Sequence, residues 1–171
     1  MADSLYTTTT IRADYDRVRR LALLNRVFNW LLRRDNTLLP LDTADRLLPY
    51  HARHDAGIQL VRISQIVGSA GRAHDFDRAF LPLRSDTMQR WLNIDRAYYE
   101  GLSLPPVELV KVGDVYFVAD GHHRVSVAKF WKQEFIEAHV VEIATPNPVR
   151  RVEDITCWED NSCPVPQLAA S

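Results

Sequence analysis

The sequence predicts an α+β fold in which a small mixed β-sheet and its helices follow an N-terminal helical segment. Apolar residues recur at steps of three and four over residues 13–34, a spacing typical of an amphipathic helix. Apolar and polar residues alternate over 58–63, and two β-rich runs, 107–112 and 115–119, flank a two-residue turn. From residue 58 the expected order is strand, helix, strand, strand, helix, strand.

Length and composition favour one globular core. The chain has 171 residues, of which 46% are hydrophobic and 25% charged, the usual balance for a folded domain. Its formal net charge of -1 gives no overall attraction to nucleic acid or anionic lipid. Residues 1–10 lack the pattern of a signal peptide, and no apolar run approaches the roughly 18 residues that span a bilayer. We therefore expect a cytoplasmic protein with no membrane partner.

Residues 1–57 are expected to form a helical extension. It begins with a frayed end over 1–10 and continues with the helix over 13–34, a short helix over 44–50 and a loop over 51–57. The apolar face of the long helix comprises Val18, Leu21, Leu24, Val27, Phe28 and Leu31.

Two properties of this helix leave alternatives open. Phe28, Trp30 and Leu31 make more apolar surface than one side of a small sheet needs, so the helix packs either on its own domain or on a second copy in a homodimer. The arginines at 17, 19, 20, 33 and 34 form either a basic patch for nucleic acid or a solvated helix face.

Residues 58–143 are expected to form the main domain. After the strand over 58–63 come a glycine-marked loop over 64–72, a single helical turn over 75–80 and a helix over 85–100, for which Ser85 is the expected N-cap. The hairpin strands follow, then a turn over 120–124, a helix over 125–132 and a strand over 136–143. Residues 144–171 read as a flexible arm in which Cys157 and Cys163 are free thiols.

The turn from Asp120 to Arg124 is the strongest candidate site. The first N–H groups of a helix lack partners within it and carry partial positive charge, so a helix that begins here attracts anions. Gly121 allows close approach of a ligand to the backbone, His122 and His123 add side-chain donors for a phosphate, and Arg124 can grip it through two parallel hydrogen bonds. Asp120, His122 and His123 are candidate catalytic groups for proton transfer, although Asp120 could instead cap the helix.

Three segments resemble the ParB/sulfiredoxin-like superfamily: the proline-marked strand entry at 104–109, the strand and turn at 116–124, and the helix start at 126–129. The resemblance covers residues 58–143 and implies that fold. Members bind CTP or ATP, phosphorylate a free amino acid, or repair a peroxidase cysteine. The resemblance therefore implies a nucleotide or phosphorylated small molecule as ligand, with magnesium and ATP, ADP or CTP as the expected cofactors.

The residues at the turn favour one branch of this superfamily. His122 stands where sulfiredoxins have their catalytic cysteine, so sulfinic-acid chemistry is not expected. His122 and His123 replace Glu-Arg of the partition proteins, and the chain is too short for their helix-turn-helix domain, so partition-site recognition is not expected either. The Asp-Gly-x-His-Arg pattern is similar to that of the free-serine kinases, which Asp120, His123 and Arg124 match.

In that fold the glycine-marked loop lies across from the turn. Gly68, Ser69 and Gly71 would then line a nucleotide, and Arg72 would contact its phosphate. Asp75 and Asp77 are the acidic candidates for a base or a metal, or else cap turns and form surface ion pairs. The histidines at 51, 54 and 74 could join the turn histidines in a metal cluster, which their spacing does not require.

Three functions follow from these patterns. The first is binding of a nucleotide or other phosphate ligand, extending to a small-molecule phosphotransferase or a nucleotide hydrolase. The second is nucleic-acid binding or cleavage, as for ParB-like nucleases, supported by the arginines of the first helix. The third is a non-catalytic regulatory or interaction module.

Overall fold

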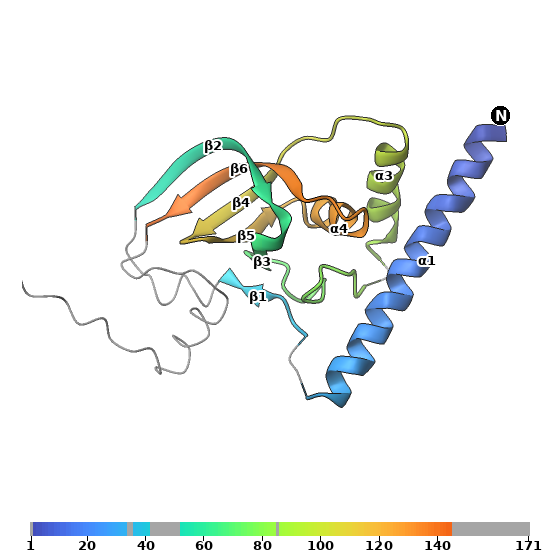
Figure 1. The fold of residues 1–171 in the computed structure, drawn as a ribbon, viewed down its shortest axis with the longest axis horizontal. Coiled ribbons are helices and arrows are strands. Elements are labelled where there is room, and N and C mark those ends of the chain that lie inside the picture. Colours follow the sequence, from blue (N-terminus) through green and yellow to red (C-terminus); the bar gives the residue numbers. More distant parts are fainter. Residues whose placement is uncertain (1, 34–35, 42–51, 85, 145–171) are drawn as a thin grey trace, which may run out of the picture.

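The computed structural model describes residues 2–33, 36–41, 52–84 and 86–144. Within these residues it confirms the α+β class: a mixed sheet is joined through α4 (His122–Phe130) and α3 (Met88–Tyr99) to a long helix, α1 (Ala2–Leu31) (Figure 1). The expected helix over 44–50, the expected cap Ser85, His51 and both cysteines lie outside the described residues, as does the arm from residue 145.

Six strands form one sheet in the order β1-β3-β5-β4-β6-β2. The predicted hairpin is confirmed, since the strands on either side of Gly113 pair antiparallel. The last strand pairs in parallel with β4 and antiparallel with β2, and so lies between them. The strands are β1 (Leu39–Pro40), β2 (Arg53–Arg62), β3 (Ile66–Ser69), β4 (Val107–Val112), β5 (Val115–Asp120) and β6 (Phe135–Ile143).

Three segments differ from the sequence-based expectation. The prediction of a loop over 51–57 is wrong from residue 53 onward, because β2 starts there. Its pairing with β6 shifts register near Gly57, where the strand forms a bulge. The loop expected over 64–72 contains β3, which pairs in parallel with β5 and β1. Residues 75–80 form no helical turn; Asp77 instead makes an isolated bridge to Thr37, and Phe76 makes one to Pro82. Each error involves pairing with a segment distant in the sequence, which local periodicity does not report.

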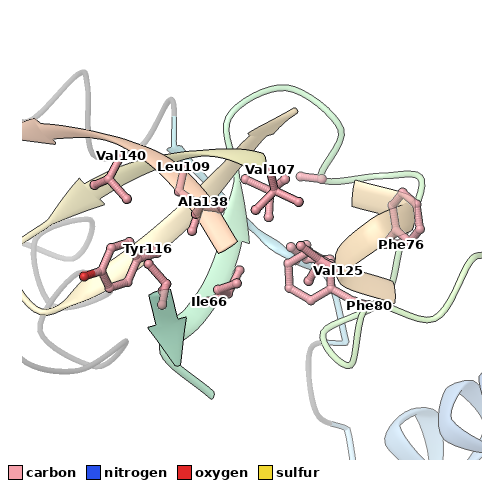
Figure 2. Packing of buried hydrophobic residues seen from close by; sticks show 13 residues of the cluster. Ile66, Phe76, Phe80, Val107, Leu109, Tyr116, Val125, Ala138 and Val140 are labelled. Atoms are coloured by element: carbon pink, nitrogen blue, oxygen red, sulfur yellow. The ribbon is translucent and has the colours of Figure 1, made fainter. Parts of the chain in front are cut away.

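The main core fills the face of the sheet that carries α4. Side chains of β3, β4, β5 and β6 meet Val125 of α4 together with Phe76 and Phe80 of the 73–82 loop (Figure 2). A smaller cluster, including Phe117 and Val112, covers the opposite face. The phenylalanines explain why the 73–82 segment is ordered without regular structure: both rings are fully buried.

A third cluster joins the helices. Trp91 of α3 lies between α1 and α4, in contact with the Tyr15 ring at a centroid distance of 5.6 Å and with the Phe130 ring at 5.6 Å. Its indole N–H donates to Ser126 Oγ at 3.1 Å. The molecule is therefore layered from the sheet through α4 and α3 to α1 (Figure 1).

Helix α1 corrects two expectations. It begins at Ala2, so residues 2–10 are helical where a frayed end was expected. Its buried stripe consists of Ile11, Tyr15, Val18 and Ala22, whereas Leu21, Leu24, Val27, Phe28 and Leu31 of the predicted apolar face are exposed.

The domain boundary expected after residue 57 falls within β2. Within the described residues, no helix has the length and apolarity needed to cross a membrane.

Candidate functional site

A hollow of about 380 Å³ lies at the N-terminus of α4. Four segments meet there: the loop after β3, helix α3, the end of β5 and the first turn of α4. The residues that line it are Arg72, Arg90, Asn93, Ile94, Asp120, Gly121, His122, His123 and Arg124. Of the facing loop, Arg72 lines the hollow beside the predicted turn.

The helix begins earlier than expected, at His122, so the two histidines and Arg124 belong to its first turn. Gly121 is the N-cap residue with a φ of 94°, a left-handed conformation that favours glycine. A Cβ at this position would lie 2.7 Å from Val107 Cγ1, so β4 also demands a glycine. No described side chain caps the helix, which leaves the N–H groups of its first turn to a ligand or to water.

Ser69 joins the facing loop to the helix. Its Oγ lies 2.7 Å from His122 Nε2 and accepts hydrogen bonds from the backbone N–H groups of Gly71 at 3.2 Å and Arg72 at 2.8 Å. Because these two bonds use both lone pairs of the hydroxyl, its hydrogen points to His122 Nε2. We therefore assign His122 as neutral, with its proton on Nδ1.

The ring of His123 is buried beside that of Phe76, with centroids 5.0 Å apart. Neither ring nitrogen has a hydrogen-bond partner among the described residues. A neutral imidazole holds one donor and one acceptor, and leaving each unpaired costs about 1–3 kcal/mol. A group kept under this penalty at the edge of a hollow is typical of a binding or catalytic role.

The hollow holds its histidines in the neutral form. Burial, reinforced by the charge of Arg72 and by the neighbouring imidazole, lowers the pKa of His122 to about 4. Burial, followed by the charges of Arg90 and Arg72, lowers the pKa of His123 to about 4. Two arginines and uncharged imidazoles thus make the local field favourable for an anion.

Arg124 has a different environment from the one expected. Its guanidinium donates to Asp120 Oδ2 at 2.7 Å, to the Pro105 carbonyl at 2.5 Å and to the Pro106 carbonyl at 2.7 Å. Its side chain is only 14% exposed, whereas that of Asp120 is 70% exposed. Most of the guanidinium donors are therefore engaged, and Arg124 holds the proline-marked strand entry against α4.

A second hollow of about 380 Å³ shares Arg72 and Arg90 with the first. It is also lined by Asp75 and by Arg84, Asp86 and Thr87. The Asp75 carboxylate lies 3.9 Å from Arg72 Nη1 and 3.8 Å from Arg84 Nε. The two hollows together form a basic groove in which arginines outnumber carboxylates.

Among the described residues, the groove has no cluster of carboxylates that would hold a magnesium ion without the phosphates of a ligand. Such a site needs carboxylate oxygens that are free to coordinate. Asp75, Asp86 and Asp120 are each paired with an arginine. In the described part of the chain, no three His, Cys, Asp or Glu side chains lie close enough together to hold a metal.

Other predicted site residues lie apart from the groove. Gly68 is packed beneath β1, where a Cβ would meet the Leu39 carbonyl oxygen and lie 2.6 Å from the Phe117 ring. Asp77 is fully buried, and its Oδ1 accepts from the N–H groups of Ala79 at 2.9 Å and Leu81 at 2.8 Å, so it serves as a turn cap. Asp77 is therefore not a candidate base or metal ligand.

The groove residues that the sequence analysis missed come from α3. Arg90 and Asn93 lie three residues apart, on one polar face of the helix. That spacing was visible in the sequence, but a polar helix face ordinarily points to solvent. Only the packing of α3 between α1 and α4 directs this face toward the turn.

Comparisons with known proteins add no family: no protein-family model matches the chain, and a search of the curated proteins finds no match.

Proposed function

We propose that the chain binds a phosphate-bearing small molecule, such as a nucleotide, in the groove at the N-terminus of α4. The observation that carries this proposal is His123, whose two ring nitrogens are unpartnered among the described residues beside an uncapped helix N-terminus. A phosphate oxygen supplies the acceptor that the first-turn N–H groups lack, and the buried imidazole N–H of His123 would reach the same oxygen by rotation of its ring toward the groove. Arg72 and Arg90 supply the positive charge.

The size of the groove suits this class of ligand. Each of the two joined hollows has a volume of about 380 Å³, within the range of roughly 300–1,000 Å³ for small-molecule sites. Ile94 offers an apolar contact, and Asn93 offers an amide for hydrogen bonding. The resemblance to nucleotide-binding ParB/sulfiredoxin-like proteins points to the same turn and remains a prediction.

We restrict the proposal to binding. Phosphoryl transfer requires a base beside the acceptor hydroxyl. His122 Nε2 already accepts from Ser69, and the Asp75 and Asp120 carboxylates are paired with arginines. The catalytic roles expected for Asp75, Asp120, His122 and His123 therefore stay predictions.

Ligand-induced stabilisation tests the proposal. The parent is melted alone and with ATP, ADP, CTP or inorganic phosphate, each with and without magnesium. A ligand at 100 times its Kd stabilises the folded state by about 2.7 kcal/mol, which for a chain of this size raises Tm by roughly 5–10 °C. We expect at least one phosphate compound to raise Tm in proportion to the logarithm of its concentration.

Paired substitutions locate the site. Arg72→Ala and Arg90→Ala should each weaken the ligand at least tenfold, because both arginines line the two hollows. Arg96→Ala is the matched control, since Arg96 is exposed on the same helix but outside the groove. The proposal fails if no phosphate compound raises Tm, or if Arg72→Ala and Arg90→Ala bind as tightly as the parent and the control.

A further inference from the structure

In the second half of α1, the side that faces the domain is polar and the side that faces away from it is apolar. Asn25 and Asn29 continue the buried stripe of the helix and are partly buried. The Asn25 amide donates to Asp77 Oδ2 at 3.3 Å, and the Asn29 amide donates to the Asn25 carbonyl at 2.8 Å. The side that faces the domain is therefore polar in this part of the helix.

The side that faces away is apolar. At about 100° per residue, its side chains cover an arc of about 200°. Within residues 21–32, Arg26 is the one charged residue. The exposed large apolar residues are Leu21, Leu23, Leu24, Val27, Phe28, Trp30, Leu31 and Leu32, and we call them the outer face of α1.

The outer face is large enough for a stable interface. Its side chains are between 44% and 78% exposed, Trp30 being the most exposed. Taking about 150 Å², the lower end of the range for aromatic side chains, for each fully exposed residue, the face presents roughly 700 Å². This exceeds the roughly 300–600 Å² of the largest patch on a typical monomer and is close to the roughly 800 Å² that each partner buries in a standard interface.

The face is also hollowed. Leu81, from the loop beside the helix, closes one side of an apolar groove of about 520 Å³ that runs along Leu24, Phe28 and Leu31. A groove of this kind accepts the ridge of side chains from another helix. A lipid surface does not supply such a ridge, and the net charge of -1 does not draw the whole chain to anionic lipid.

We propose that the outer face of α1 is the interface of a homodimer, in which it packs against the outer face of a second copy. A two-fold interface is formed by the same patch on both subunits, and this patch can face its own copy because none of its residues carries a charge that would meet a like charge. Its occupant must be almost free of charge, and the chain itself provides such a surface.

Multi-angle light scattering tests the dimer with the full chain. The parent should have twice the monomer mass of 19.7 kDa at micromolar concentrations. Leu24→Glu and Leu31→Glu should each return the monomer mass, because each places a charge within the outer face. Leu60→Glu is the matched control: Leu60 is 72% exposed, but it lies on β2 and should leave the dimer intact.

A measurement on the parent alone avoids reliance on the folding of the variants. Because dimerisation stabilises the folded state by mass action, Tm should rise as protein concentration increases a hundredfold. A monomeric parent with a constant Tm overturns the proposal. Co-sedimentation of that monomer with phosphatidylserine vesicles would assign the face to lipid instead.

Discussion

His123 is the residue at which stability and binding should separate. Its imidazole is buried without a hydrogen-bond partner among the described residues. Replacing it by leucine removes both unpaired nitrogens while keeping an apolar side chain against Phe76. We expect His123→Leu to raise the free energy of unfolding by about 1–3 kcal/mol in urea titrations, and to abolish stabilisation by the phosphate ligand.

The neighbouring histidine provides the contrast. His122→Leu leaves the Ser69 hydroxyl without its acceptor in a buried position, so this variant should be less stable than the parent by about 1–3 kcal/mol. If His123→Leu were destabilised to the same extent as His122→Leu, then the imidazole of His123 would have a structural partner, and its role as a ligand-binding group would be refuted.

Strand β3 gives a prediction about the glycine-marked segment. Gly68 and Gly71 looked equivalent in the sequence, but a Cβ at Gly68 would collide with the Leu39 carbonyl and the Phe117 ring, whereas a Cβ at Gly71 meets nothing within 4 Å. We expect Gly68→Ala to cost about 2–4 kcal/mol in urea titrations, because the backbone of β1 must move. Gly71→Ala should change the stability by less than about 0.5 kcal/mol.

Measurements of nucleotide binding by these variants test the alternative that Gly68 lines the ligand. If Gly68 lined the ligand, as the sequence analysis expected, Gly68→Ala would weaken binding while the fold kept its stability. We expect the reverse order: any loss of ligand affinity in Gly68→Ala should follow the loss of folded protein, as monitored by circular dichroism.

Elements with strong local signals could be predicted, and elements made by distant pairing could not. The hairpin around Gly113 was predictable because two alternating runs flank a turn dipeptide. Strand β3 was missed because its four residues are recognised as a strand only through their pairing with β5 and β1. For the site, the sequence indicated the turn through Asp120–Arg124, but Arg90 reaches it by packing of α3, which no local pattern records.

At the scale of the whole molecule, stability should fall in mild acid. The folded-state pKa values of His122 and His123, about 4, lie below the ordinary value of 6.5. Between those values the unfolded chain binds more protons than the folded one, so stability present above pH 6.5 is lost as pH falls toward 4. Each histidine contributes a slope of up to about 1.4 kcal/mol per pH unit.

Asp95 acts in the opposite direction. Burial, opposed by the hydrogen bond from Trp131 and helped by Asp14, raises its pKa from 3.8 to about 6. Its contribution to stability is fully present below pH 3.8 and is lost as pH rises through 6. It therefore offsets about one of the two histidine slopes between pH 6 and 4.

Substitution of Asp95 tests whether its ionisation offsets the effect of the histidines on stability. Asp95→Asn keeps an oxygen for the Trp131 N–H but cannot ionise, so we expect it to be more stable than the parent at pH 8 and to lose stability more steeply between pH 6 and 4. Urea titrations at pH 8, 6 and 4.5 measure both effects. An unchanged slope would show that Asp95 does not take up a proton on folding in this range.

The hydrogen bonds of the Arg124 guanidinium have a consequence for the rate at which a ligand binds. One guanidinium ties the end of β5 and the first turn of α4 to the prolines that follow α3, so it fixes the site before a ligand arrives. Prolines at 105 and 106 further restrict backbone rotation there. Association then requires no closure step, and its observed rate should increase linearly with ligand concentration without reaching a plateau, and should fall as salt screens the arginines that steer an anion.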